Sequence, residues 1–590
     1  MIRSSRPRWP IVLPACALFA LHAAQFGAWQ IDDAGISFAY ARNLALGHGL
    51  VAQPGVIPVE GYSNPLWVFL LATFSVVRLF DPLWTPKLLS FAFAFGTFAL
   101  LDRLLARSGV GTALSALALG LLAVQSSFAI WMVSGLENPL YVCLFVGLVL
   151  LSLRAIQKVA SPRVAIAAGL IASGLALTRP EGILFAALFP LAVGLAPERR
   201  FRRWVPYLAA FALPVALYLA VRLAWFGVWV PNTFYAKGGP TLATLTGLAA
   251  LDPFPANRAL TLLRAAFGKP GAWVGLAMLL ALGYLLGRGK LRRETLLLVL
   301  ATLFSALPYL LLPLDWMPEY RFATPFFPLV MILLAKIASD LWPIDAGETP
   351  AVPGRAHPTS EGDGRLTVQE TAHPRNDDRS TTPGTLAGLA LRVCSSWDRR
   401  RLAGILLSVA LVASVLTSNL PRTRRFAAKP TVPFSTVEQR YGHDYNHFAD
   451  QLQLRQGSIL LPDVGGTLWR SRLTVYDLGG LCNPTIARTL GKNDRAFHDY
   501  VFETLRPTFI HIHHYWTVRA KLDSDPRFAR DYLPLYEEVE PYAAARTKGQ
   551  TLRSGDFVRK EVAAGHPKEI ASIRTALVAS YALERGSDGN

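Results

Sequence analysis

The chain has 590 residues, of which 52% are hydrophobic and only 17% are charged, and its formal net charge at pH 7 is +19. Long uncharged runs of this kind indicate membrane spans and exclude an ordinary soluble protein. The positive charge does not point to nucleic acid, because no RNA- or DNA-binding motif accompanies it and many Lys and Arg residues lie in short loops between apolar runs. The four cysteines are scattered, which favours neither a zinc site nor a disulfide framework.

About 11 apolar runs have a length that suits the roughly 30 Å hydrocarbon core of a bilayer. They cover residues 10–29, 87–104, 110–131, 138–153, 163–178, 182–197, 204–226, 270–287, 294–312, 322–342 and 402–419. The first run follows MIRSSRPRW without a clear small-x-small cleavage site before Asp32, so we expect a retained signal anchor. The fold expected is therefore an α-helical polytopic membrane protein.

The cationic loops set the expected orientation. They lie at the N-terminus, at Arg103 with Arg107, and at 154–163, 198–203 and 288–293, and the positive-inside rule assigns them to the cytoplasm. A crossing at 64–80 would turn the later Arg-rich loops outward, so we expect this segment to be re-entrant or interfacial. The protein is then expected in the inner (cytoplasmic) membrane with a cytoplasmic N-terminus.

The chain divides by composition into four parts. Residues 1–342 hold most of the spans, and 343–400 are rich in Pro, Gly, Thr, Asp and Arg, which predicts a disordered cytoplasmic loop. Residues 401–420 form the last expected span. Residues 421–590 read as an extracytoplasmic α/β domain, with short strands in 457–465, 473–479 and 506–516 and a helix in 565–585. No catalytic motif stands out in this domain, so we expect it to bind an acceptor.

The most informative stretch is 31–67, IDDAGISFAYARNLALGHGLVAQPGVIPVEGYSNPLW, which opens with Asp32 and Asp33. Carboxylates are costly in hydrocarbon and imply a function where they occur beside a span. At the outer mouth of a membrane helix, either acid is placed to act as a general base on a lipid-linked substrate. The alternative is that the pair caps the helix AGISFAYARNLAL, and the two roles can coexist.

Five ordered motifs carry a family resemblance. DDAGISFAYARNLALGHGL and EGYSNPLW are followed by TRPEG (178–182), PNTFYAKGG (231–239) and DWMPEYRFATPFFP (315–328). Together they resemble the GT-C class of membrane glycosyltransferases, and within it the terminal arabinofuranosyltransferases of mycobacterial cell-wall arabinan, which use decaprenyl-phosphate arabinose. The motifs occur in the same order as in that family over most of residues 25–342, and a weaker similarity is present in residues 463–484. The chain departs from it at Gly35, where an aromatic residue is expected, and in the insert 343–400.

The resemblance implies roles for several residues. Asp32, the first acid, would be the base, and Asp33 would hold the acceptor, the base or a metal. The leaving phosphate needs cations. Arg179 suits it through its guanidinium, although it can instead snorkel and pair with Glu181. The likeness favours Arg321, which has Asp315 and Glu319 as possible internal partners.

Other outer residues are candidates for contacts with the substrates. Lys237 suits a phosphate or a sugar hydroxyl, and the alternative is a solvated loop lysine. Residues expected to line the sugar site by hydrogen bonding or stacking are Glu60, Tyr62, Glu137, Glu181, Asn232, Tyr235, Asp315 and Trp316. Aromatic residues also gather at membrane interfaces for solvation alone, and Glu137 can instead cap the helix that begins at Asn138-Pro139. The histidines His511, His513 and His514 lack companion ligands, which favours packed or exposed side chains over a metal site.

The expected function is the transfer of a sugar, arabinofuranose or a similar pentose, from a polyprenyl-phosphate donor to an extracytoplasmic glycan or glycoconjugate. No cofactor is implied with certainty, although paired carboxylates can bind a divalent cation. One competing hypothesis is a transporter or flippase for lipid-linked sugars, which would show repeats and charges near the bilayer midplane. Another is a non-enzymatic scaffold whose outer domain binds glycan.

Overall fold

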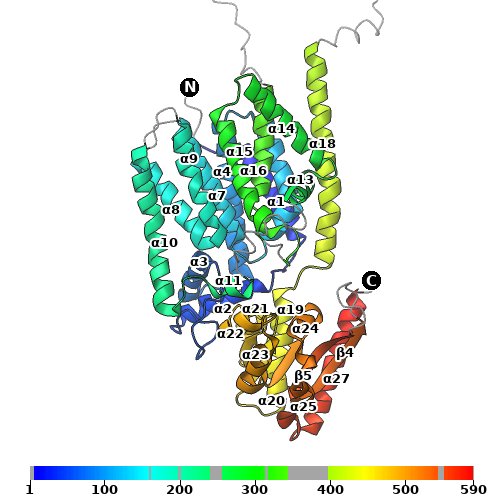
Figure 1. Ribbon diagram of the computed structural model, residues 1–590. Helices are drawn as coiled ribbons and strands as arrows, with labels where there is room; N and C mark the ends of the chain where they lie inside the picture. The colour runs from blue at the N-terminus through cyan, green and yellow to red at the C-terminus, as the bar shows by residue number, and fades with distance from the viewer. Residues whose placement is uncertain are drawn as a thin grey trace, which may run out of the picture.

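The computed structural model describes residues 6–157, 161–196, 201–238, 255–312, 316–342, 396–541 and 551–588. Apolar helices stand side by side in a bundle, and the chain after α18 folds into a second body at one end of that bundle (Figure 1). Short helices from the bundle and from the second body meet between them. This seam contains the Asp32–Asp33 pair.

The bundle contains a helix within each apolar run predicted from the sequence. Its helices are α1 (Trp9–Ala24), α4 (Trp84–Arg107), α5 (Thr112–Ala123), α6 (Ser126–Met132), α7 (Asn138–Gln157), α8 (Pro162–Thr178), η1 (Pro180–Ala187), α9 (Leu188–Leu195), η2 (Phe201–Arg203), α10 (Trp204–Phe226), α13 (Pro255–Phe267), α14 (Gly271–Gly287), α15 (Arg293–Leu311), η4 (Arg321–Ala323), α16 (Phe326–Leu341) and α18 (Ser396–Ala428). Within the described ranges, 5 helices are long and apolar enough to cross a membrane, or up to 7 if each bent pair is one span. The prediction of a polytopic helical protein is confirmed.

Two pairs of consecutive apolar helices are sharply bent at the break between them. The axes of α5 and α6 meet at 66°, and those of α13 and α14 meet at 102°. The side chain of Gln125, at the first bend, donates to the carbonyl of Ala265 in α13 (2.8 Å), so the two bent pairs brace each other. Helix α13 was not predicted. Its Arg258 is buried and donates to the carbonyl of Leu312 (2.7 Å), which satisfies the C-terminal end of α15.

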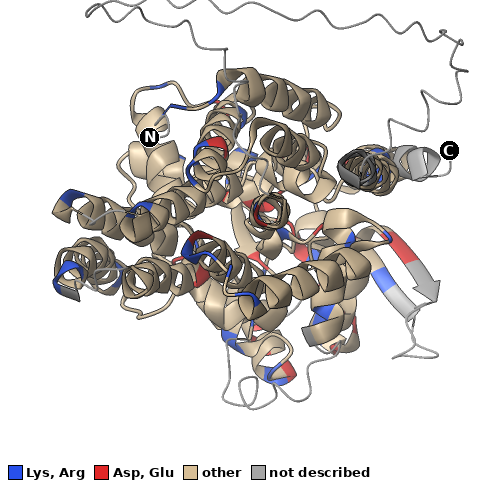
Figure 2. Cartoon of the chain, turned by 90° about the horizontal axis from the view of Figure 1, so that it is seen from above, with Lys and Arg blue, Asp and Glu red and all other residues tan. Residues whose placement is uncertain are grey.

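The segment expected to be re-entrant or interfacial forms α3 (Pro65–Val76). Its 12 residues measure only about 18 Å along the axis, too little to cross the hydrocarbon core. Three short helices lie at the same end of the bundle, next to the second body: α2 (Asp33–Ala45), α3 and α11 (Asn232–Ala236) (Figure 1). Seen along the bundle, most of the helical surface is uncharged, and many Lys and Arg residues lie at helix ends (Figure 2).

The second body is built on a five-stranded sheet of order β2-β1-β3-β5-β4. Strands β1 (Ser458–Leu461), β2 (Thr474–Asp477) and β3 (Phe509–Ile512) are parallel, and each lies in a segment predicted as a strand. Strand β5 (Thr551–Arg559) joins β3 and β4 (Tyr532–Pro541) antiparallel, and this hairpin was not predicted. All four residues of β3 are buried, as expected for a parallel strand covered on both faces.

Helices cover this sheet and connect it to the bundle. They are α19 (Phe434–Val437), the π-helical turn η5 (Glu438–Asp444), α20 (Tyr445–Gln451), α21 (Gly465–Arg470), α22 (Pro484–Thr489), α23 (Asp494–Asp499), η6 (Tyr500–Leu505), α24 (His514–Ala520), η7 (Leu522–Ser524), α25 (Pro526–Asp531), α26 (Lys560–Ala563) and α27 (Pro567–Asp588). Helix α27 matches the helix predicted in 565–585. The predicted loop 343–400 lies almost wholly outside the described residues.

Candidate functional site

The first turns of α2 lie against the second body. The carboxylate of Asp32 accepts one hydrogen bond on each oxygen, from the backbone N–H of Gly465 (2.9 Å) and of Gly466 (2.7 Å). These N–H groups begin α21, so Asp32 satisfies the start of a helix more than 400 residues away in the sequence. It makes no side-chain cap on α2 itself. The alternative that the Asp pair caps its own helix is therefore wrong for Asp32, because its carboxylate bonds to α21.

The close approach of α2 and α21 depends on glycine. A methyl group on Gly35 would lie 2.4 Å from the carbonyl carbon of Gly465 and 2.7 Å from the ring of Phe434. A methyl group on Gly465 would lie 1.8 Å from the carbonyl oxygen of Asp32. Further along the same face, the guanidinium of Arg42 lies 4.5 Å from the ring centre of Trp469. The glycine at position 35, unexpected from the family resemblance, is thus required by the seam.

Another face of α2 carries Asp33, Ser37 and Tyr40, which are spaced i, i+4 and i+7 and therefore share one side of the helix. Asp33 is half-buried, and its charge acts on Asp477 and Cys482 in the second body. The hydroxyl of Tyr40 accepts from the N–H of Gly61 (3.1 Å) and lies 4.0 Å from the sulfur of Cys482. The two adjacent acids therefore differ, since Asp32 belongs to the docking face and Asp33 to the polar face.

Several carboxylates gather where the two bodies meet. Burial, with the nearby charge of Asp463, raises the pKa of Asp32, although its two backbone N–H donors favour the charged form. Burial likewise raises the pKa of Asp477 to about 6, against the hydrogen bonds that it accepts from the N–H groups of Cys482 (2.7 Å) and Gly480 (3.1 Å). Both groups accept a proton more readily than a surface carboxylate.

A buried ionic cluster is connected to the polar face of α2. The amide of Asn64 donates to Ser37 (3.1 Å) and to one oxygen of Glu137 (2.7 Å). The other oxygen of Glu137 accepts from Arg179 (2.7 Å), which also pairs with Glu181 (2.5 Å). The ion pair of Arg179 with Glu181, which the sequence offered as the alternative to phosphate binding, is present. Glu137 uses its carboxylate on Arg179 and Asn64, not on the start of α7.

Arg321 lies beside this cluster on a strained loop. Its guanidinium lies 5.2 Å from the ring centre of Phe322, and that of Arg179 lies 5.0 Å from the same ring. The two preceding residues, Glu319 (φ 61°) and Tyr320 (φ 57°), have left-handed backbones, which non-glycine residues adopt at functional sites when the surroundings enforce it. Hydrogen bonding of Glu319 to Ser127 (2.8 Å), together with an ion pair to Arg422 (3.5 Å), helps hold this loop.

Glu60 and Tyr62 form a second buried group. Glu60 accepts a bidentate pair of hydrogen bonds from Arg222 (2.6 and 3.0 Å) and another from the hydroxyl of Tyr218 (2.5 Å). That hydroxyl also contacts the hydroxyl of Tyr62 (3.2 Å), whose ring packs edge-on against Tyr40. Glu60 is therefore engaged in joining α10 to the loop before α3, and Tyr62 borders the polar face of α2.

The motif PNTFYAKGG is tied to the second body. The amide of Asn232 donates to the carbonyls of Gly480 and Leu481 (2.8 Å each), and the ring of Tyr235 lies 4.5 Å from the guanidinium of Arg488. Lys237 and Trp316 are exposed, at the margin of the seam and on the loop before Arg321 respectively. Asp315 lies outside the described residues. Of the sequence-predicted residues, those that gather around the polar face of α2 are Asp33, Tyr62, Glu137, Arg179, Glu181 and Asn232.

The sequence reasoning missed Asp463, Asp477 and the residues that pair with the predicted acids. A signal was present in PDVGG and YDLGG, because an Asp-x-Gly-Gly sequence stands just after the first short strand and at the end of the second. Both motifs lie at the seam, one holding Asp32 and the other near Asp33. No set of three or more His, Cys, Asp or Glu in the described ranges is arranged to hold a metal ion.

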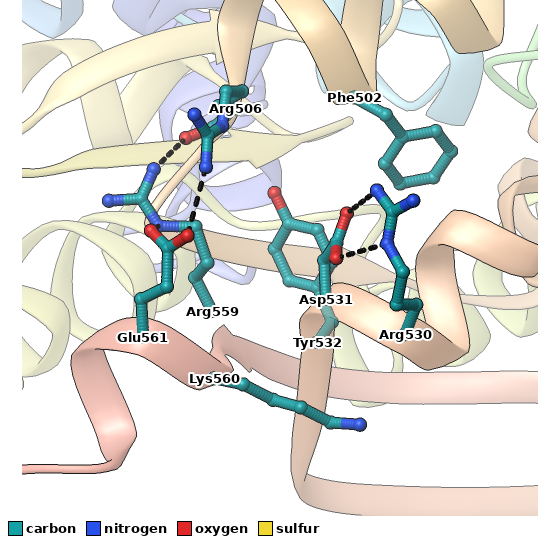
Figure 3. A pocket seen from close by; sticks show the side chains of 8 residues that line it. All are labelled: Phe502, Arg506, Arg530, Asp531, Tyr532, Arg559, Lys560 and Glu561. Atoms are coloured by element: carbon teal, nitrogen blue, oxygen red, sulfur yellow. Dashed lines mark hydrogen bonds and ion pairs between the residues drawn. The ribbon is translucent and has the colours of Figure 1, made fainter.

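A separate cavity of about 100 Å³ lies in the second body (Figure 3). Its walls are Phe502, Arg506, Arg530, Asp531, Tyr532, Arg559, Lys560 and Glu561. Asp531 takes two hydrogen bonds of 2.7 Å from Arg530, and Glu561 pairs with Arg506 (3.1 Å). The carboxylates thus neutralise part of the cationic lining, and none of the sequence-predicted site residues lines it.

Comparisons with known proteins give the following. No family model and no curated protein matches the chain. The fold is similar to that of the archaeal oligosaccharyltransferase AglB from Archaeoglobus fulgidus, solved with an inhibitory peptide and a dolichol-phosphate, at 11% identity and a TM-score of 0.47, covering 94% of this chain and 76% of that one. It is also similar to ArnT from Cupriavidus metallidurans bound to undecaprenyl phosphate, at 12% identity and a TM-score of 0.46, covering 93% of this chain and 98% of that one.

Proposed function

We propose that this protein is a GT-C glycosyltransferase that moves a sugar, arabinofuranose or a similar pentose, from a polyprenyl-phosphate donor to an extracytoplasmic glycan or glycoconjugate. The observation that carries the proposal is the division of α2 into two faces. One face fixes the second body through Asp32, and the other presents Asp33 beside a hydrogen-bonded path to Arg179. In this proposal the N-terminus is cytoplasmic and residues 421–590 are extracytoplasmic.

The reaction needs a base and a site for the phosphate that leaves. An acceptor hydroxyl attacks the anomeric carbon, the bond from that carbon to the phosphate oxygen breaks, and the hydroxyl proton passes to the base. The resemblance gave the base's role to Asp32. The contacts favour Asp33 as the base and Asp32 as the residue that positions it, because both oxygens of Asp32 already accept N–H groups of α21.

Arg321 is the proposed ligand of the donor phosphate. A guanidinium binds phosphate through two parallel N–H groups, and the strained loop before Arg321 fixes its direction. Arg179 lies against the same phenyl ring, but Glu137 and Glu181 offset its charge. Its proposed role is therefore to hold the wall of the site, with Lys237 at the margin nearest the lipid headgroups.

The test is donor consumption by the full-length protein in detergent, with a panel of polyprenyl-phosphate sugars that includes decaprenyl-phosphate arabinose. Release of polyprenyl phosphate is the readout. Asp33→Asn should lower transfer by about 10²- to 10⁴-fold while the melting temperature stays near that of the unmodified protein. Asp32→Asn should lower the melting temperature, because its amide would face an N–H donor. Asp494→Asn, where the carboxylate is 42% exposed and pairs with Lys521 of the second body, is the matched control.

The outcomes separate the alternatives. If no donor in the panel is consumed, the glycosyltransferase proposal is overturned, and movement of an intact donor across vesicles would favour the flippase instead. If Asp33→Asn keeps full activity while a folded Asp32→Asn is inactive, the base is Asp32. Loss of activity in Asp33→Asn alone supports the division of roles proposed here.

A further inference from the structure

His513 and Asp463 meet at a particular point of the sheet. Asp463 follows β1 and His513 follows β3, and the Nε2 atom of His513 lies 2.9 Å from Oδ2 of Asp463. The parallel strands have the order β2-β1-β3. The connection after β1 therefore leads to β2 on one side of it, and the connection after β2 crosses to β3 on the other side. The carboxyl ends of β1 and β3 therefore form the topological switch point, where open α/β sheets bind ligands.

The His513–Asp463 pair differs from the neighbouring pair of His511 with Asp556. His511 and Asp556 are buried inside the domain, where Tyr441 also bonds to His511 (2.9 Å). The side chains of His513 and Asp463 are 31% and 19% exposed. Among the described residues, no hydrogen bond reaches the Nδ1 atom of His513. The inner pair is part of the core, and the outer pair has a ring nitrogen available to a ligand.

The switch point is next to Asp32, the residue that precedes the proposed base. Gly465 and Gly466, two and three residues after Asp463, hold Asp32, and the charge of Asp463 acts on Asp32. On the other side, a methyl group on Gly479 would lie 3.1 Å from Asp477 and 3.4 Å from the ring of Trp516. The ring of Trp516 therefore lies near the carboxylate of Asp477, whose pKa the charge of Asp33 helps to raise.

The backbone after β3 is strained. His514 has φ 44°, a left-handed value that a non-glycine residue keeps only where its surroundings enforce it. This conformation begins α24 and leaves Tyr515 55% exposed, with its ring 5.6 Å from that of Trp516. Paired polar groups beside aromatic faces are the means by which proteins hold sugar rings, through hydroxyl hydrogen bonds and ring stacking.

We propose that His513 and Asp463 bind hydroxyl groups of the acceptor glycan at the switch point, with Trp516 stacking on a sugar ring, and that they determine acceptor specificity. The inference rests on the proposed glycosyl transfer and adds the half of the site that the membrane helices do not provide. The acceptor then lies between His513 and Asp33, with its reacting hydroxyl at Asp33.

The experiment uses the full-length protein in detergent and short oligosaccharides of arabinofuranose, galactofuranose and mannose as probes. Binding is measured by calorimetry, and transfer is measured as polyprenyl phosphate release. His513→Ala should weaken oligosaccharide binding about tenfold and raise KM for the acceptor, leaving kcat and KM for the donor unchanged. His513→Gln, which can still bond Asp463, should lose less. His443→Ala, at an exposed histidine of η5, is the control and should bind as the unmodified protein does.

Two results would overturn the inference. One is a folded His513→Ala variant with unchanged binding and acceptor KM, and the other is an unmodified protein that binds none of the probes saturably. A fall in kcat with constant acceptor KM would also overturn it, because a binding residue acts on ground state and transition state alike. Failure of the proposed function is distinct, since the unmodified protein would then release no polyprenyl phosphate.

Discussion

Replacing Gly35 with alanine tests whether the seam positions the proposed active site. The added methyl group would lie 2.4 Å from a backbone carbon of Gly465 and 2.6 Å from its carbonyl oxygen, and neither atom belongs to a flexible side chain. Contacts below 3.0 Å force a backbone shift, so α2 and α21 must separate. Such a shift would stretch the two hydrogen bonds that hold Asp32 and would move Asp33, one residue away on the same helix.

The expected cost follows from two opposed effects. Overpacking a tight contact destabilises a protein by about 1–3 kcal/mol, whereas alanine is the better helix former than glycine by about 1 kcal/mol. The net result should be a loss of up to about 2 kcal/mol, seen as a lower melting temperature by intrinsic fluorescence. Transfer activity should fall further than stability does, because the proposed base, Asp33, is displaced in the molecules that remain folded.

A matched control lies in the bundle. Gly120 is also helical, in α5, and a methyl group there meets no atom within 4 Å. Gly120→Ala should therefore melt at the same temperature or slightly higher. If Gly35→Ala has the melting temperature of the unmodified protein and keeps full transfer activity, the close packing of α2 on α21 does not position the site.

Three further predictions concern buried charges. Arg179→Met leaves Glu137 buried without its counter-charge and should cost about 3–5 kcal/mol. Adding Glu137→Gln should restore part of that loss, and strictly additive melting shifts would contradict the pairing. Because burial raises the pKa of Asp477 to about 6, the folded state binds a proton between pH 4 and 6 that the unfolded state lacks. The unmodified protein should thus gain up to about 3 kcal/mol over Asp477→Asn as the pH falls from 7 to 4, and a constant difference would refute this. Arg222→Met should destabilise the protein unless Glu60→Gln accompanies it, as a double-mutant cycle would show.

The helices could be predicted because each apolar run is a local property of the chain. Helix α13 was not predicted because Arg258 and Arg264 interrupt its apolar residues. The apolar residues then recur with a helical period but do not form a continuous apolar run. The hairpin of β4 and β5 was not predicted for a similar reason. Its charged and apolar residues alternate only weakly, and its pairing depends on β3, which lies before it in the chain.

The sequence allowed several residues of the candidate site to be predicted, but not the contacts that they make. Asp32, Arg179 and Arg321 stand in motifs that sequence reasoning can find. Two adjacent acids look equivalent in a sequence, however, and only the start of the helix and the position of α21 distinguish Asp32 from Asp33. The partner of Asp32 is 433 residues away, and no local pattern indicates a contact at that distance.

The division of α2 into faces also limits how the chain can change. Successive residues of an α-helix are rotated by about 100°. One residue inserted after Asp33 would therefore carry Ser37 and Tyr40 away from the acid that shares their side, and would turn a bulkier neighbour toward Gly465. Substitutions on the lipid side of the bundle meet no such restriction. We expect length changes in this protein to be tolerated in its loops and to be absent from the thirteen residues of this helix.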